Sequence, residues 1–365
     1  MKKVMFVFGT RPEAIKMCPI IKVCNKNRSL QCSVCVTGQH REMLQQVLEI
    51  FQVVPDYNLE VMQKNQTLFD ITIQILNKMR SVLETEKPDI VMVHGDTTTT
   101  FVTSLACFYL KIPVGHVEAG LRTYDINSPY PEEFNRQAVS IVAQYNFAPT
   151  YAAKENLILE GKKEKSIYVT GNTVIDALRT TLQTPCNNEN IEWLRSGRGI
   201  LLTAHRRENI GEPLYHIFKA VKQIANDFRD VRILYPIHLN PKVRKIAYEV
   251  FDEVENIRLI EPQDVITFHH LMNAAYFIMT DSGGIQEEAP ALGKPVLVMR
   301  DTTERPEGVE AGTLKLVGTL QTAVYNAAAE LLTDRKAYEK MSKAENPYGD
   351  GHASEKIMQI IVDSV

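Results

Sequence analysis

The sequence predicts an α/β protein of two successive domains, and three observations lead to that prediction. The chain has 365 residues, which is more than one hydrophobic core usually serves. Short apolar segments alternate with amphipathic segments of helical spacing, a pattern typical of βαβ units and a mainly parallel sheet. The alternation restarts after a polar, turn-rich stretch at residues 184–190. We therefore expect two Rossmann-like domains with a cleft between them.

The first run of alternating elements extends from residue 4 to residue 117. Short apolar segments predict strands at 4–8, 33–37, 90–93 and 114–117. Apolar residues at helical spacing predict helices at 12–24, 41–51, 68–83 and 99–110. Cys32 and Cys35 form a C-x-x-C on the second of these strands, whereas a redox motif would require a helix N-terminus. We therefore expect no redox or metal role for these two thiols.

The second run begins at residue 200. Strands are predicted at 200–203, 231–235, 276–280 and 295–299, and a helix at 214–225. The crossover between the two runs falls within residues 171–185, next to the polar stretch.

Composition and charge exclude several classes of protein. Lys and Arg total 41 and Asp and Glu total 44, and the formal charge of −3 argues against a dedicated nucleic-acid-binding protein. No apolar run approaches the roughly 20 residues that a bilayer requires, and the segment before Gly9 is too short for a signal-peptide core. Six cysteines in a chain of this length do not make a disulfide scaffold, so we expect reduced thiols and a cytoplasmic protein.

Polar and titratable residues follow five of the predicted strands. In an open parallel sheet, ligands bind at the carboxyl ends of the strands, so these segments are the candidate site. They are Gly9–Lys16, His94–Thr100, Glu118–Arg122, His205–Asn209 and Asp281–Glu288. Caps and turns alone would not require this density of Asp, Glu, His and Arg.

Two adjacent glycines, Gly283 and Gly284, open a predicted helix that runs to Leu292. They let a ligand approach the backbone, where free N–H groups and the helix dipole favour an anion such as a diphosphate. Arg11 and Lys16 of the other domain could close on the same anion. The alternatives are a capped helix and ordinary surface charge.

Asp96 and Glu118 form a candidate acid/base pair, because two carboxylates in different environments can divide the two roles. Taken alone, Asp96 is more simply explained as the N-cap of the helix that follows it. Glu132 and Arg136 are four residues apart and could pair on one helix face, with a surface ion pair as the default explanation. The preceding loop, residues 123–131, is long enough to act as a lid.

His94 with Asp96 and His116 with Glu118 have the residue types of metal ligands. No helical His-x-x-x-His accompanies them, and a strand directs successive side chains to opposite faces. We therefore expect no catalytic metal.

Seven motifs, in order and over essentially the whole chain, resemble the non-hydrolysing UDP-N-acetylglucosamine 2-epimerases. They are Phe8–Met17, His94–Thr99, His116–Thr123, Pro131–Arg136, Thr170–Thr173, His205–Asn209 and Ser282–Glu288. The resemblance implies the two-domain fold of the GT-B glycosyltransferases and a homodimer. It also implies reversible C2 epimerisation of UDP-N-acetylglucosamine to UDP-N-acetylmannosamine by elimination and re-addition of UDP through 2-acetamidoglucal. No cofactor is needed, and the product would supply N-acetylmannosamine for bacterial surface polysaccharide.

The resemblance also implies a domain division and roles for particular residues. The first domain, with the catalytic carboxylates, would comprise residues 1–172 joined by the C-terminal helix 352–365, and the UDP-binding domain residues 173–351. The catalytic residues would be Asp96, Glu118, Glu132, Arg136 and His205. The nucleotide contacts would be Arg11, Lys16, His205, Gln263, Phe268, Ser282, Gly283, Gly284, Glu288 and Arg305. Phe268 would pack beside the uracil, Gln263 would read its edge, and Glu288 would bind the ribose hydroxyls.

Bacterial members of this family also share a second, activating UDP-N-acetylglucosamine site. Its pattern falls on Gln39, Glu42, Asn65, Glu132, Arg206 and His238. The family pattern has Gln in place of Glu42 and Arg in place of Asn65. A carboxylate gained and a cation lost both disfavour a diphosphate. We therefore predict weak or absent substrate activation.

Four other functions fit parts of the pattern. An epimerase of a related UDP-diacetamido-uronic acid would begin with Gly-Ala-Arg-Pro-Gln rather than the present Gly9 to Glu13 segment. A hydrolysing epimerase would release free N-acetylmannosamine, and a GT-B glycosyltransferase would require an acceptor. A non-catalytic sensor of nucleotide sugars would not need so many titratable groups at strand ends.

Overall fold

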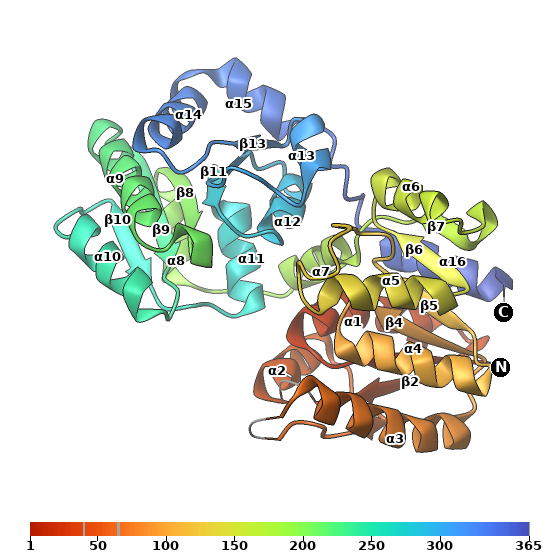
Figure 1. The fold of residues 1–365 in the computed structure, drawn as a ribbon. Helices are drawn as coiled ribbons and strands as arrows, with labels where there is room; N and C mark the ends of the chain where they lie inside the picture. Colours follow the sequence, from red (N-terminus) through yellow and green to blue (C-terminus); the bar gives the residue numbers. More distant parts are fainter. Residues whose placement is uncertain (39–40, 64–65, 365) are drawn as a thin grey trace. The chain divides into compact units, whose positions relative to one another are not determined.

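The computed structural model describes residues 1–38, 41–63 and 66–364, with the backbone alone for residues 41–43. The chain forms two compact units, Met1–Thr180 with Tyr348–Val365 and Thr181–Pro347. Each unit is a parallel sheet with helices on its faces (Figure 1). This is the α/β architecture of two Rossmann-like units that the alternating pattern predicts.

The first unit contains a seven-stranded parallel sheet in the order β3-β2-β1-β4-β5-β6-β7. Its strands are β1 (Lys2–Phe8), β2 (Leu30–Val36), β3 (Tyr57–Asn58), β4 (Ile90–His94), β5 (Val114–Val117), β6 (Tyr145–Ala148) and β7 (Ile167–Val169). The chain runs outward from β1 in one direction and then returns to place β4 on its other side. The carboxyl ends of β1 and β4 are thus the switch point, where such sheets bind ligands.

Helices cover both faces of this sheet because alternate side chains of β1 point to opposite sides. The helices are α1 (Arg11–Lys26), α2 (Arg41–Phe51), α3 (Leu68–Glu86), α4 (Thr98–Leu110), α5 (Glu132–Val142), α6 (Tyr151–Leu159), α7 (Thr173–Leu182) and α16 (Ala353–Ser364), with a 3-10 turn η1 (Glu164–Ser166). Val4, Phe6 and Phe8 enter one core with α1, α2 and α16, whereas Met5 and Val7 enter another with α3 and α4.

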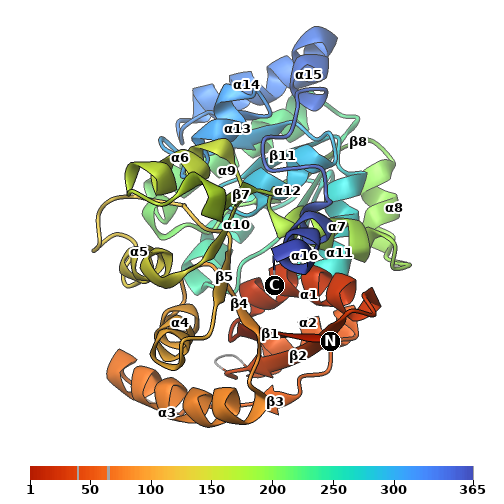
Figure 2. The same cartoon turned by 90° about the vertical axis from the view of Figure 1, so that its right-hand side faces the viewer.

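The last helix, α16, packs against α1 (Figure 2). Its apolar residues Ile357, Met358 and Ile361 are buried in the core that β1 and α1 share. The Asp176 carboxylate on α7 accepts hydrogen bonds from the backbone N–H groups of Ala353 and Ser354 at the start of α16. Ala177 of α7 belongs to the same core. Residues 173–180 therefore lie with the first unit, and the chain divides after Thr180, within the 171–185 range given for the crossover.

The second unit contains a six-stranded parallel sheet in the order β10-β9-β8-β11-β12-β13. Its strands are β8 (Arg198–Thr203), β9 (Val231–Pro236), β10 (Ile257–Ile260), β11 (Phe277–Thr280), β12 (Val296–Val298) and β13 (Leu314–Leu316). Its helices are α8 (Glu189–Arg195), η2 (Arg207–Asn209), α9 (Glu212–Asp227), α10 (Pro241–Phe251), α11 (Val265–Ala274), α12 (Ile285–Ala291), α13 (Pro306–Glu310), α14 (Gln321–Thr333) and α15 (Arg335–Ser342). Here the switch point lies between the carboxyl ends of β8 and β11.

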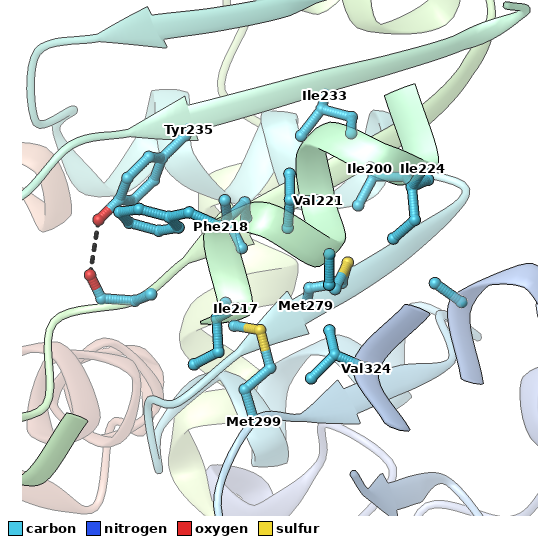
Figure 3. Close-up of a cluster of buried hydrophobic side chains, with 14 of the residues drawn as sticks. Ile200, Ile217, Phe218, Val221, Ile224, Ile233, Tyr235, Met279, Met299 and Val324 are labelled. Carbon is cyan, nitrogen blue, oxygen red and sulfur yellow. Dashed lines mark hydrogen bonds between the residues drawn. The ribbon is translucent and has the colours of Figure 1, made fainter. Parts of the chain in front are cut away.

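The hydrophobic core of the second unit holds the backbone that follows β8 at this switch point. Phe218 and Val221 of α9 pack over the sheet beside Tyr235 of β9 (Figure 3). The Tyr235 hydroxyl donates a 2.6 Å hydrogen bond to the backbone carbonyl of Ala204, directly after β8. The packed core therefore fixes the backbone from which the following residue, His205, extends.

The predicted strands and helices are all present, with ends that move by a few residues. Cys32 and Cys35 lie on β2, as predicted. Among the residues that the structure describes, no helix has both the length and the apolar character of a membrane span.

Candidate active site

Glu118 is the centre of a charged cluster at the switch point of the first unit. It follows β5, and its backbone has a φ of 62°, a left-handed conformation that is uncommon outside glycine. The Lys16 ammonium, from α1, lies 2.7 Å from both oxygens of the Glu118 carboxylate. His94 Nε2, at the end of β4, lies 2.8 Å from Glu118 Oε2. Two other segments of the chain therefore converge on the buried carboxylate of Glu118.

These partners decide the charge of Glu118. Burial by itself opposes ionisation of the carboxyl, but Lys16 and His94 outweigh burial and hold the pKa of Glu118 well below its usual range. Glu118 is thus an ionised carboxylate at neutral pH. Lys16 is one-sixth exposed and engaged with Glu118, so it is not an ordinary surface charge.

Asp96 has the opposite electrostatic character. Burial and the nearby charge of Glu118 raise its pKa, although the Arg136 guanidinium acts against that rise. Arg136 Nη2 donates to Asp96 Oδ2, and Asn135 Nδ2 donates to the Asp96 carbonyl at 2.8 Å. The first unit therefore holds two carboxylates whose pKa values are shifted apart, which is the arrangement that separates an acid from a base.

Two local interpretations of these residues are wrong. The N-cap of α4 is Thr97, whose hydroxyl accepts from the backbone N–H of Thr100, so the Asp96 side chain does not cap the helix. Arg136 pairs with Asp96 and with Glu133, three residues before it, rather than with Glu132. Glu132 is half-buried at the first position of α5 and makes no ion pair within the described part of the chain.

Sequence reasoning missed Glu13, a buried carboxylate that joins the two sides of the switch point. Its Oε2 accepts from the N–H groups of Gly9 and Thr10 after β1, and its Oε1 accepts from the hydroxyl of Thr97 after β4. The spacing from Thr10 to Glu13 is that of a capping box, which would have indicated the first half of this role. No local pattern predicts the hydrogen bond from Thr97, because Thr97 is distant from Glu13 in the sequence.

His116, on β5, holds the backbone next to Asp96. Its side chain is fully buried, and Nε2 lies 2.7 Å from the carbonyl of Gly95, the residue before Asp96. Burial lowers the pKa of His116 to about 3, so the ring is neutral. A neutral ring with Nε2 protonated donates to Gly95 and fixes the backbone next to Asp96.

In the second unit, Asp281 organises the predicted residues after β8. The buried Asp281 carboxylate accepts from the backbone N–H groups of His205 and Arg206, at 2.8 and 2.9 Å, and from Asn209 Nδ2. The His205 ring stacks on that of His238, with 5.2 Å between centroids. Burial lowers the pKa of His205, so the imidazole is predominantly neutral at pH 7.

The glycine turn before α12 is open. No atom lies within 4 Å of the position that a Cβ at Gly284 would occupy, and at Gly283 the nearest is Arg206 Nη2, at 3.5 Å. Ser282 precedes them, and its N–H donates to the Thr280 hydroxyl. A ligand can therefore reach this backbone beside a guanidinium.

The other predicted nucleotide contacts of the second unit lie on three segments. Glu288 Oε2 of α12 lies 3.6 Å from His269 Nε2 of α11. Phe268 is half-buried on α11, and Gln263 Nε2 donates to the carbonyl of Glu261. Arg305, before α13, pairs with the buried Glu287.

The remaining predicted residues are Arg11 and those of the activating site. Arg11 is half-buried at the start of α1 and makes no ion pair among the described residues. Of the activating-site residues, Gln39, Asn65 and the side chain of Glu42 lie outside the described residues. His238 is exposed, and its Nδ1 accepts from the N–H of Asn240.

Two doubly wound units, each with open or titratable groups at its switch point, define the class of nucleotide-binding α/β enzymes. The pair of oppositely shifted carboxylates in the first unit is of the kind that acid/base catalysis uses. The family model for UDP-N-acetylglucosamine 2-epimerase matches residues 22–362, and the chain belongs to this family.

The chain is similar to other members of the family over nearly its whole length. It is 55% identical over 357 residues to a UDP-N-acetylglucosamine 2-epimerase of Bacillus subtilis, covering 98% of this chain and 94% of the relative. A crystal structure of the UDP-GlcNAc 2-epimerase of Neisseria meningitidis bound to UDP-GlcNAc is 49% identical, with a TM-score of 0.87 over 99% of this chain and 100% of that one. The S. aureus MnaA–UDP structure is also 49% identical, with a TM-score of 0.89 and coverage of 100% and 98%.

Proposed function

We propose that this protein interconverts UDP-N-acetylglucosamine and UDP-N-acetylmannosamine by inverting C2 of the sugar. Family membership gives the substrate class. The observation that carries the chemistry is the pair formed by Asp96 and Glu118, two carboxylates with opposite pKa shifts at the switch point of the first unit. Such a pair supplies one group that can change its protonation state and one that stays ionised.

The reaction consists of an elimination and its reversal on the other face. A base takes the C2 proton, the C1–C2 double bond of 2-acetamidoglucal forms, and the C1–O bond breaks with its electron pair leaving on UDP. A proton then arrives at the opposite face of C2, and UDP adds back to C1. No net oxidation or reduction occurs, so the residues of the chain suffice without a cofactor.

We assign proton transfer at C2 to Asp96. A base is most effective when its pKa approaches the working pH, and the pKa of Asp96 is raised whereas that of Glu118 is held low. Glu118 then serves as the fixed anion that keeps Lys16 and His94 in place. Glu132, half-buried and without an ion-pair partner in the described part of the chain, is the carboxyl group we assign to the opposite face.

The second unit would bind the UDP moiety. The open turn at Gly283 and Gly284 allows the diphosphate to approach backbone N–H groups beside Arg206. His205, neutral and held through its backbone by Asp281, would donate a hydrogen bond to the departing diphosphate. Glu288 would accept from the ribose hydroxyls. The other contacts would come from Gln263, Phe268, Ser282 and Arg305.

The setting of the reaction is also part of the proposal. We place the enzyme in the cytoplasm, as a homodimer, supplying N-acetylmannosamine for surface polysaccharide. The basis is the resemblance to bacterial members of the family.

Incubation with UDP-N-acetylglucosamine in deuterated water tests the proposed reaction. We expect a mixture of both epimers with deuterium at C2. Free N-acetylmannosamine together with UDP would indicate a hydrolysing enzyme, and turnover only with an added acceptor would indicate a glycosyltransferase. Unchanged substrate without deuterium would refute the proposal.

A further inference from the structure

We propose that Glu133 is a positioning residue that holds Arg136 against Asp96 and fastens the loop of residues 123–131 to this pair. The inference rests on the proposed function and adds to it a residue that the seven motifs do not distinguish from its neighbour Glu132. It concerns the first unit alone.

The contacts of Glu133 carry the proposal. The side chain is fully buried on α5. Its Oε2 accepts from the N–H of Thr123 at 3.0 Å, and its Oε1 accepts from the N–H of Tyr124 at 3.1 Å and from Gln137 Nε2 at 2.8 Å. Its Oε2 also lies 3.3 Å from Arg136 Nη1. A buried carboxylate is costly unless it is paired and hydrogen-bonded, and Glu133 has both kinds of partner.

The Arg136 guanidinium is thereby held from two sides. Nη1 faces Glu133, and Nη2 donates to Asp96 Oδ2. A planar guanidinium between two carboxylates has little freedom to rotate, so Glu133 sets the orientation in which Arg136 meets Asp96. The adjacent Asn135 fixes the Asp96 backbone through its 2.8 Å hydrogen bond.

Glu133 also limits how strongly Arg136 acts on Asp96. Among the described residues, the charged groups that act on Asp96 include Arg136 on α5, Glu118 after β5 and His94 on β4. Glu133 faces Arg136, Lys16 faces Glu118, and Glu13 and the neutral His116 contact the residues on either side of Asp96. Removing the charge of Glu133 would leave Arg136 compensated on this side by Asp96 alone. The pKa of Asp96 would then fall, away from the working pH, and the base would weaken.

The test compares three variants of the full chain. Glu133→Gln removes the charge and keeps the shape, and Glu133→Asp keeps the charge. Glu160→Gln is the matched control. Glu160 forms a bidentate ion pair with the buried Arg122 side chain of the same unit and does not contact Asp96. Measurements are kcat, KM, thermal stability and the pH profile of kcat/KM with UDP-N-acetylglucosamine.

We expect Glu133→Gln to lower kcat by at least about tenfold and to move the acidic limb of the pH profile down by about half a pH unit or more. Glu133→Asp should keep the limb in place, and Glu160→Gln should keep both kcat and the limb. An acidic limb that stays in place in Glu133→Gln, or moves equally in Glu160→Gln, would overturn the proposal whatever the loss of stability.

A substrate-free measurement separates this inference from the proposed reaction. Carbon-13 NMR of protein labelled at the aspartate carboxyl follows the titration of Asp96 directly, with Asp96→Asn identifying the signal. A lower midpoint in Glu133→Gln supports the positioning role even if the wild-type enzyme leaves UDP-N-acetylglucosamine unchanged. An unmoved or higher midpoint refutes that role even if the enzyme is active.

Discussion

Lowering the pH from 7 to 5 should destabilise the first unit through a single imidazole, that of His116. Burial lowers the pKa of this ring from an ordinary 6.5 to about 3. The folded-state pKa is therefore below the unfolded-state value. The stability that depends on the neutral ring is complete above pH 6.5 and is lost progressively as the pH falls toward 3.

The magnitude follows from the size of this shift. Each pH unit below 6.5 costs about 1.4 kcal/mol as long as the folded ring stays neutral. Between pH 6.5 and pH 5 the loss is therefore about 2 kcal/mol, a large part of the stability of an ordinary domain. Because the ring is hydrogen-bonded to the Gly95 carbonyl, we expect this loss of stability to affect the backbone next to Asp96.

Urea unfolding of the wild type and of His116→Asn, at pH 7 and at pH 5, measures the effect. Asparagine keeps an N–H donor for Gly95 but does not titrate. Circular dichroism follows both units, whereas the fluorescence of Trp193, the only tryptophan, follows the second unit alone. The wild type should lose about 2 kcal/mol more than the variant in the first unit, with no such difference at Trp193. Equal losses in the two proteins would refute the reasoning.

Three further predictions concern the site and its support. Asp96→Asn, Glu118→Gln and His205→Ala should each lower kcat well over tenfold while the circular dichroism spectrum stays native, since acid/base groups typically supply about 10²–10⁴-fold; near-wild-type rates in all three would refute the site. Gly120→Ala should lower stability by about 2 kcal/mol or more, because the residue has a φ of 91° and a Cβ there would come within 2.1 Å of the Ala153 carbonyl oxygen; an unchanged melting temperature would contradict this. Initial rates should depend hyperbolically on UDP-N-acetylglucosamine concentration, and strong sigmoidal behaviour would show that substrate activation persists.

The sequence was sufficient for the fold class because the central strands are unambiguous. Residues 4–8 of β1 and 90–93 of β4 are short, buried apolar runs followed by polar residues, and a parallel sheet brings such ends together. Strands such as β7 (Ile167–Val169) and β13 (Leu314–Leu316) have only three residues each, too few to show a periodicity. Their place is fixed by the neighbouring strands with which they pair.

The pairings within the site could not be read from local spacing. Asp96 and Thr97 are both good N-cap residues, and the backbone geometry of the fold decides that Thr97 takes the role. Glu132 and Arg136 have the spacing of a helical pair, but the arginine pairs with Asp96 and with Glu133. Glu133 is fully buried, and an ion pair is stronger where water is excluded. Glu13 meets Thr97 only because the sheet places β1 beside β4.

The contribution of α16 to the first core affects the order in which the protein matures on the ribosome. Residues 181–347 form a continuous stretch, so the second unit can complete its core as soon as that stretch has emerged. The N-terminal segment is made first, but its core is complete only when Ile357, Met358 and Ile361 of α16 are packed into it. Asp176 then accepts the hydrogen bonds from the start of α16. During translation the earlier-made half is therefore the later to finish, with apolar surface that chaperones can bind until the final helix arrives.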